Sequence, residues 1–325
     1  MPSPCQICGN PDENRIHKAR EMMLGTRDVF EYLECGKCGT LQIVEVQDLS
    51  KYYPRHYYSI DPSAPVEVAR KFRRRAAAKL VGRFLITGRS PLGKYLSEKR
   101  PGVRKLFPKS LLDPILGLNF ESKILDFGCG NGQLLRTLYH FGFRDLTGAD
   151  AFIDSDIAGP GGIMIYKQPL DKLFASFDLI MLNHSFEHLR DPRESLRHIY
   201  RLLNANGTAL IRIPVVNYAW EKYGVKWVQL DPPRHLFLYT EASFGKIADE
   251  AGFHLSKIVY DSEVFQFFGS EQYTMDIAMN DPRSFRGVSE TSIFSQEQID
   301  EWTLETEKLN AESRGDQACF YLRKK

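Results

Sequence analysis

The segment ILDFGCGNGQLL, residues 124–135, has the residue types of a ligand-binding turn. A short apolar run leads into three glycines, and leucines at helical spacing follow. Such a strand–turn–helix unit can hold nucleotide phosphates, the pyrophosphate of a dinucleotide, or S-adenosylmethionine. A dinucleotide fingerprint needs a third small residue where this chain has Gln133, and a P-loop needs a lysine that does not follow Gly132. The turn therefore fits neither phosphate-binding motif.

Two carboxylates narrow the class of ligand. Asp126 precedes the first glycine by two residues, where its charge would repel a pyrophosphate but accept hydrogen bonds from a cationic amino group. Gly128 and Gly130 have no side chains, so the backbone can approach that ligand closely. Asp150 ends the next strand, where a carboxylate can bind both ribose hydroxyls. Together these residues indicate S-adenosylmethionine, an adenosine compound with an amino group and no phosphate.

Two C-x-x-C pairs near the start of the chain have the spacing of metal ligands. They comprise Cys5, Cys8, Cys35 and Cys38, and each pair is followed by glycine. Two thiolates on a tight turn bind one ion, and two such turns complete a tetrahedral zinc site. Four cysteine ligands leave no position open for substrate, so we expect a structural zinc ribbon that stabilises a segment with little core of its own.

The elements that must position these residues alternate between strand and helix from Phe120 almost to the end of the chain. FDLIMLN is a continuous apolar run, as expected for a strand buried on both faces of a sheet. DPRESLRHIYRLL opens with an aspartate cap and a proline, which predicts a helix. This order predicts an α/β fold with an open, mostly parallel sheet and helices on both faces.

Composition divides the chain into three parts. Residues 1–48 form the expected zinc ribbon, 49–118 an aromatic linker and basic helical segment, and 119–325 the ligand-binding domain. Within the last part the connections 214–239 and 261–315 are much longer than usual, so we expect them to cover a site. SQEQIDEWTLETEKLNA in the second connection predicts a helix.

The segment 69–109 contains fourteen Lys or Arg residues and one acid, although the whole chain has a formal net charge of only +2. Phe72, Ala76, Leu80 and Phe84 are four residues apart, which predicts an apolar helical stripe. The basic face suits an anionic substrate, an anionic membrane surface or nucleic acid, or it is simply solvated. With no long apolar run and no secretory pattern, we expect a cytoplasmic protein, peripheral at the inner membrane face if this helix binds lipid.

The motifs ILDFGCGNGQLL, LTGAD, FDLIMLNHSFEHLRDP, LLNANGTALIRIP and DPPRHLFLYT together resemble class I S-adenosylmethionine-dependent methyltransferases. The resemblance covers roughly residues 120–260 and the final strand. It is strongest to the small-molecule group found with sugar, polysaccharide and quinone biosynthesis, and similar zinc ribbons accompany sugar-modifying members. It implies a Rossmann-like sheet of seven strands and S-adenosylmethionine as the methyl donor.

The resemblance also implies which residues bind the cofactor. In the family the glycine turn and its acid hold the methionine end, and the second acid holds the ribose. Residues that end the fourth strand line the pocket. The adenine is met by residues next to the ribose acid and by residues after the strand that follows this acid. The corresponding positions are Asp126, Gly128, Gly130, Asp150, Ala151, Phe152, Gln168, Pro169, Leu170, Asn183 and His184.

Methyl transfer requires an enzyme to position the acceptor and remove its proton. His184 and His188 leave the fourth strand at the carboxyl edge of the sheet, and His235 lies in the connection 214–239, so all three are candidate bases. Glu187 either orients a histidine, joins it in holding a metal ion, or ties down the start of a helix. Arg234 is a candidate contact for an anionic group of the substrate.

The tyrosines before the basic segment, Tyr52, Tyr53, Tyr57 and Tyr58, either form a lid over the cofactor or anchor the linker, and Tyr57 is the expected substrate contact. We expect O-methylation of a sugar, glycan or lipid-linked intermediate. The alternatives are a nucleic-acid or protein methyltransferase that binds its target through the ribbon and the basic helix, or a cofactor-binding protein without catalysis. NHSF in place of Asn-Pro-Pro-aromatic makes methylation of nucleic-acid bases the less favoured reading.

Overall fold

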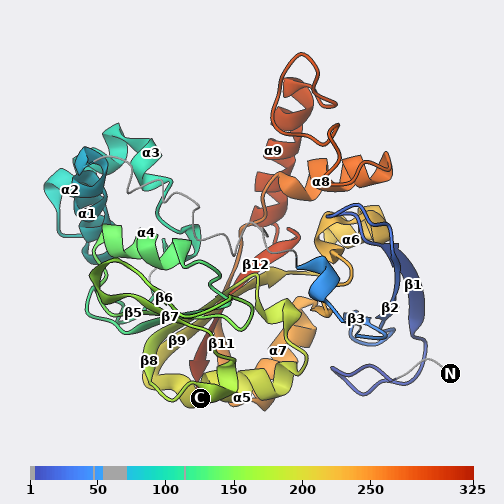
Figure 1. Ribbon diagram of the computed structural model, residues 1–325, viewed down its shortest axis with the longest axis horizontal. Coiled ribbons are helices and arrows are strands. Elements are labelled where there is room, and N and C mark those ends of the chain that lie inside the picture. Colours follow the sequence, from blue (N-terminus) through green and yellow to red (C-terminus); the bar gives the residue numbers. More distant parts are fainter. Residues whose placement is uncertain (1–3, 47, 54–71, 113–114) are drawn as a thin grey trace.

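The computed structural model describes residues 4–46, 48–53, 72–112 and 115–325, which contain two sheets (Figure 1). The smaller sheet is antiparallel and consists of β1 (Arg15–Arg20), β2 (Val29–Glu34), β3 (Leu41–Ile43) and β10 (Phe237–Leu238). The larger sheet has the order β11-β12-β9-β8-β4-β5-β7-β6 and occupies the centre of the molecule.

The larger sheet is mixed. Its strands are β4 (Ile124–Phe127), β5 (Leu146–Ala149), β6 (Ile157–Ala158), β7 (Met164–Tyr166), β8 (Phe177–Asn183), β9 (Leu203–Pro214), β11 (Phe253–Tyr260) and β12 (Gln317–Lys324). Strands β7, β5, β4, β8 and β9 run parallel, whereas β12, β11 and β6 pair antiparallel with their neighbours. The α/β fold is confirmed, but the described strands number eight rather than seven, because the two-residue β6 adds to β7 at one edge.

Strand β8 shows why the sheet is covered on both faces. Leu179 and Met181 join one apolar cluster, whereas Ile180 and Leu182 join the other. Successive side chains of a strand point to opposite faces, so a continuous apolar run needs cover on each. One cover contains α1 (Phe72–Thr87) and α4 (Gln133–Phe141), and the other contains α5 (Pro192–Leu202) and α7 (Glu241–Glu250), as Figure 1 shows.

Local signals fix the starts of the two helices of the lower layer in Figure 1. The Asp191 side chain accepts a hydrogen bond from the backbone N–H of Glu194, and Pro192 takes the first position of α5. Thr240 and Ser243 form a reciprocal capping box at the start of α7. These caps satisfy backbone donors that a helix leaves free in its first turn, so the helix predicted from residue 191 is confirmed.

The basic segment forms α1, α2 (Pro91–Lys99) and the short α3 (Pro101–Arg104). The buried face of α1 consists of Ala77, Ala78, Val81 and Gly82. A Cβ at Gly82 would lie 2.2 Å from the carbonyl oxygen of Phe141, so small residues let α1 and α4 come into backbone contact. Ala76 is exposed, and Leu80 and Phe84 are half-buried, so the predicted stripe is wrong. The side chain of Phe72 lies outside the described residues.

The two long connections are partly helical. In 214–239, α6 (Tyr218–Tyr223) precedes β10, whose Phe237 and Leu238 pair with Gln42 and Leu41 of β3. The expected ribbon at residues 1–48 is thus completed by a strand from the larger domain. In 261–315, α8 (Phe265–Thr274) and α9 (Gln296–Ala311) extend away from the sheet (Figure 1), which confirms the helix predicted there. No helix in the described part of the chain has the length and apolar character needed to cross a membrane.

Candidate active site

A cavity of about 1370 Å³ lies at the carboxyl ends of β4, β5, β8 and β9. Its lining includes residues of the glycine turn and of the two long connections. Nine of the expected cofactor positions line it: Asp126, Gly128, Asp150, Ala151, Phe152, Pro169, Leu170, Asn183 and His184. Gly130 and Gln168 are not among its lining residues. Tyr57, the expected substrate contact, lies outside the described residues.

The glycine turn is held by two sets of hydrogen bonds. Gly128 has φ +75°, and a Cβ there would lie 2.3 Å from the Cβ of Ser185, so only glycine fits. The Ser185 hydroxyl donates to the carbonyl of Phe127 at 2.8 Å. The backbone N–H of Gly130 donates to the Asp150 carboxylate at 2.9 Å. Gly130 therefore positions the Asp150 side chain and does not itself line the cavity. Ser185 was missed from the sequence, because its role depends on the spatial approach of β8 to the turn.

Asp126 and Asn183 place polar groups next to the turn. Asp126 is buried, and burial raises the pKa of its carboxyl to about 7. The side-chain amide nitrogen of Asn183 is buried and has no hydrogen-bond partner among the described residues. Buried polar groups are normally paired, so these two fit a ligand that carries an amino group and a carboxylate.

The two oxygens of Asp150 are both held by backbone. Oδ2 accepts from Gly130, and Oδ1 accepts from the backbone N–H of Phe152 at 2.8 Å. A carboxylate oxygen can accept more than one hydrogen bond. Each oxygen of Asp150 therefore remains able to accept from a ribose hydroxyl, as the position of this acid predicts.

One ring nitrogen of His184 is hydrogen-bonded, and the other faces Glu187. Its Nε2 accepts a hydrogen bond from Nη1 of Arg212 at 2.8 Å, and the guanidinium of Arg212 also binds Asp261 at 2.7 Å. Its Nδ1 lies 3.5 Å from Oε1 of Glu187. Because Nε2 already faces a guanidinium, this ring is better placed to orient its neighbours than to take a proton. Arg212 and Asp261 carry no motif that would have marked them in the sequence.

Glu187, His188 and His235 converge beside the cavity, which His188 and His235 line. The rings of the two histidines lie 4.9 Å apart, and Nε2 of His235 lies 3.8 Å from Oε1 of Glu187. Burial lowers the pKa of His235 to about 4. Burial alone would raise the pKa of Glu187, but its contact with His184 and the proximity of His188 and His235 bring it down to about 2. Glu187 is therefore a buried carboxylate beside the imidazoles of His188 and His235.

Arg234 does not reach the cavity. Its side chain is fully buried, and its Nε donates to Asp231 at 2.9 Å. A second nitrogen, Nη2, binds the other oxygen of Asp231 and lies 3.6 Å from Glu21. The expected contact with an anionic substrate does not fit this position. Arg234 instead ties the ribbon, through Glu21, to the loop that carries His235.

The aromatic residues before the basic segment reach the cavity through Tyr53. Its ring stacks on Phe152 at 5.2 Å with an interplanar angle of 8°, and its hydroxyl lies 3.2 Å from Nδ1 of His188. Tyr52 instead packs on Phe30 and bonds Asp28. The contacts of Tyr52 fit the expected anchor, and Tyr53 lines the cavity, where the alternative lid is expected. Tyr58, like Tyr57, lies outside the described residues.

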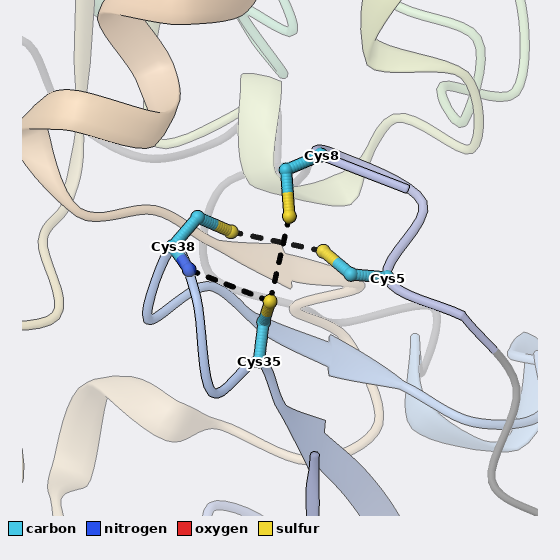
Figure 2. Close-up of side chains that lie close together, drawn as sticks. All are labelled: Cys5, Cys8, Cys35 and Cys38. Atoms are coloured by element: carbon cyan, nitrogen blue, oxygen red, sulfur yellow. Dashed lines mark hydrogen bonds between the residues drawn. The ribbon is translucent and has the colours of Figure 1, made fainter. Parts of the chain in front are cut away.

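The four paired cysteines meet at one point in the ribbon, as Figure 2 shows. The sulfur of Cys5 lies 3.7 Å from that of Cys38, and the sulfur of Cys8 lies 3.5 Å from that of Cys35. Zinc–sulfur bonds of about 2.3 Å place tetrahedral ligands roughly 3.8 Å apart. The thiols are not paired as disulfides, so the set fits one zinc ion.

Comparisons with known proteins agree with the class that this sheet and cavity define. A family profile described as a methyltransferase domain matches residues 69–258, more than half of the chain. The chain therefore belongs to the methyltransferase domain family, and it is an S-adenosylmethionine-dependent methyltransferase. A comparison with curated proteins finds no match.

Solved structures of similar fold are distant in sequence. Mitomycin 7-O-methyltransferase MmcR is 12% identical with a TM-score of 0.40, over 74% of this chain and 60% of that one, so this chain spans less than two thirds of its length. A chain of the complex between the Haloferax volcanii Trm112 methyltransferase activator and a methyltransferase is 14% identical with a TM-score of 0.44. The match covers 75% of this chain and 97% of that one. A methyltransferase from Archaeoglobus fulgidus is 19% identical with a TM-score of 0.38, over 71% of this chain and 94% of that one.

Proposed function

We propose that this methyltransferase transfers the methyl group of S-adenosylmethionine to a hydroxyl oxygen of a small acceptor, a sugar, glycan or glycolipid intermediate. One observation carries the proposal: a continuous cavity joins the glycine turn to the Glu187–His188–His235 cluster. Its volume, about 1370 Å³, exceeds the roughly 300–1,000 Å³ of ordinary ligand pockets. That volume provides room for an acceptor beside the cofactor.

The cofactor would lie along the carboxyl ends of β4 and β5. Asp126 accepts hydrogen bonds from the amino group of the methionine end, and the free amide of Asn183 donates to its carboxylate. Asp150 accepts from the ribose hydroxyls. The adenine lies among Ala151, Phe152, Pro169 and Leu170, which line the same part of the cavity. Each residue here keeps the role that the family resemblance implies.

The reaction is an in-line displacement at the methyl carbon. The bond from carbon to sulfur breaks as the bond to the acceptor oxygen forms, and S-adenosylhomocysteine leaves. The hydroxyl proton is lost at the Glu187–His188–His235 cluster, the group of titratable residues at the acceptor end of the cavity. We assign His184 a positioning role because its Nε2 is occupied by Arg212.

The charge of the cavity favours a neutral acceptor group. Its described lining includes ten Asp or Glu residues and two Arg residues. A cavity with an excess of negative charge repels polyanions, including the phosphates of nucleic acid, whereas it accepts hydroxyl groups. This charge supports methylation of a polyhydroxylated molecule over methylation of RNA or DNA.

A labelled transfer assay tests the proposal. The full chain is incubated with S-adenosylmethionine that carries a deuterated methyl group and, in parallel, with nucleotide sugars, lipid-linked saccharides and RNA. We expect a trideuteromethyl ether in a saccharide arm, located by tandem mass spectrometry, and S-adenosylhomocysteine in equal amount. Transfer to RNA alone would overturn the proposal.

We also propose that Cys5, Cys8, Cys35 and Cys38 bind a structural zinc ion. The ribbon contacts the loop of His235: Tyr32 donates to the backbone carbonyl of His235 at 2.7 Å. Zinc would therefore hold this loop as well as the ribbon itself. Mass spectrometry of the native protein should find one tightly bound zinc, and Cys38→Ser should lose it and lower the melting temperature. A Cys38→Ser protein with full zinc content contradicts this assignment.

A further inference from the structure

The carboxylate of Glu187 has no partner that matches its charge. The residue is fully buried in the short 3-10 helix Phe186–His188, and neither carboxylate oxygen has a hydrogen-bond partner within the described residues. The nearest nitrogen atoms belong to His184 at 3.5 Å and His235 at 3.8 Å, both beyond hydrogen-bond length. A buried, ionised and unpaired carboxylate is costly, so folded proteins keep one where a cation binds.

The Arg234 guanidinium, from the loop that also carries His235, is already committed. Arg234 is hydrogen-bonded to both oxygens of Asp231 and lies 3.6 Å from Glu21. Glu21 in turn accepts from the backbone N–H groups of Leu24 and Thr26. Asp231, Glu21 and Glu187 are all buried, and Arg234 forms its ion pairs with the first two. A divalent cation beside Glu187 would balance the remaining charge.

Both histidines are oriented as metal ligands usually are. Nδ1 of His188 lies 2.8 Å from the carbonyl oxygen of Arg234, and Nδ1 of His235 lies 2.7 Å from that of Gln229. A carbonyl only accepts, so each Nδ1 carries the hydrogen and each Nε2 keeps its lone pair. Metal-bound histidines typically donate their second ring N–H to a carbonyl in this way, which fixes tautomer and orientation.

We propose that Glu187, His188 and His235 bind a divalent transition-metal ion at the acceptor end of the cavity. One ligand atom from each residue lies within 4.8 Å of the others, so small side-chain movements bring all three to bonding distance of one ion. Two imidazoles and one carboxylate suit Zn²⁺, Mn²⁺, Fe²⁺ or Co²⁺ better than Ca²⁺, which prefers a shell of oxygens. All three residues are separate from the four cysteines of the ribbon.

Three protein ligands leave coordination positions open, in contrast to a tetracysteine site. His188 and His235 line the cavity, so these positions face the space for the acceptor. An acceptor hydroxyl bound to the ion would ionise more readily, and its proton would pass to water in the cavity. This catalytic consequence rests on the proposed methyl transfer to a hydroxyl, whereas metal binding itself does not.

Metal binding can be measured without any acceptor. The zinc-loaded full chain is titrated with MnCl₂, CoCl₂ and ZnCl₂, with free Mn²⁺ followed by electron paramagnetic resonance and the other ions by calorimetry. We expect one site per chain beyond the ribbon zinc. Loss of groups that merely support a metal ligand costs about 10- to 100-fold in affinity, so Glu187→Gln and His188→Gln, which remove ligands, should cost more than about 100-fold.

His254→Ala is the matched control, because His254 is exposed on β11 and should leave the affinity unchanged. Circular dichroism checks that each variant is folded. If Glu187→Gln does not fold, the affinity of His188→Gln decides the outcome. Absence of binding by all three ions, or equal binding by the folded ligand variants, overturns the inference. Methyl transfer that persists in Glu187→Gln without added metal contradicts the catalytic role of the ion, whereas metal binding without transfer to any hydroxyl contradicts only the proposed function.

Discussion

The two ends of the cavity are built from the sequence in different ways. At the cofactor end, Asp126, Gly128 and Gly130 belong to one turn, and Asp150 bonds directly to that turn at 2.9 Å. At the acceptor end, Glu187 and His188 follow β8, while His235 comes from a connection that also completes the ribbon sheet. The cofactor end is a local structure, whereas the acceptor end depends on three parts of the chain.

This difference indicates which parts of the enzyme set its chemistry and which set its specificity. The glycine turn is fixed by hydrogen bonds to Asp150, just after β5, and from Ser185, just after β8. The acceptor end is fixed by long-range bonds, such as that from Tyr32 to the carbonyl of His235 and the ion pair between Glu21 and Arg234. Changes in the ribbon should therefore alter acceptor turnover and leave cofactor affinity in place.

A large effect should come from Asp150→Ala at the cofactor end. The change removes the ribose acceptor and leaves the backbone N–H groups of Gly130 and Phe152 without partners. We expect S-adenosylmethionine to bind about 100-fold more weakly, measured by calorimetry. The control is Asp145→Ala, whose exposed side chain lies before the opposite end of the same strand. Similar affinities for the two variants would contradict the assignment of the ribose site.

At the acceptor end, His235→Gln should lower kcat without changing cofactor affinity. Loss of a proton-transfer group, or of a ligand to a metal that activates the hydroxyl, costs about 10²- to 10⁴-fold. The measurement pairs steady-state kinetics with a calorimetric titration of S-adenosylmethionine. A change in cofactor affinity as large as the change in kcat would show that the two ends are not separate.

Cofactor binding should depend on pH through Asp126. Burial raises the pKa of its carboxyl to about 7, so the free protein holds it protonated below that pH. The ammonium of the ligand favours the carboxylate, so binding must release a proton, and affinity should fall about tenfold for each pH unit below 7. Calorimetry between pH 5.5 and 7 in two buffers measures both effects. Asp126→Asn should bind S-adenosylmethionine more weakly at pH 7, and its affinity should not change with pH. A pH dependence that persists in this variant would exclude Asp126 as its source.

The smallest effect should come from Tyr53→Ala, which removes the ring stacked on Phe152. Aromatic pairs contribute about 0.5–1.5 kcal/mol, which corresponds to roughly a two- to tenfold rise in KM for S-adenosylmethionine. Tyr95→Ala, at an exposed position of α2, is the control and should show no rise. An unchanged KM for both variants would mean that Tyr53 does not cover the cofactor.

The sequence predicts the central sheet well because its signals are local. The continuous apolar run of β8 and the caps at Asp191 and Thr240 each act within one element. The apolar stripe of α1 could not be predicted, because Gly82 allows backbone contact with α4 and this reverses the usual preference for large buried side chains. The short β6 also depends on a neighbour, β7, more than on its own two residues.

In the candidate site, too, the sequence predicts residues that lie close together in the chain and not contacts between distant segments. The glycine turn and the two acids follow from spacing along the chain, and the cavity brings them together. The place of Arg234 could not be predicted, because its partner Glu21 is more than two hundred residues away in the sequence. Ser185 and Arg212 were missed for the same reason, since each acts through a contact with another strand or turn.

The most direct test of the account is a calorimetric titration of S-adenosylmethionine into the folded wild-type chain, Asp126→Asn and Glu187→Gln at pH 7. We propose that Asp126 binds the cofactor and that Glu187 belongs to the acceptor end. We predict one binding site in the wild type, an unchanged affinity in Glu187→Gln and a strongly weakened one in Asp126→Asn. Equal affinity in the wild type and Asp126→Asn, or loss of binding in Glu187→Gln, would contradict a cavity with separate cofactor and acceptor ends.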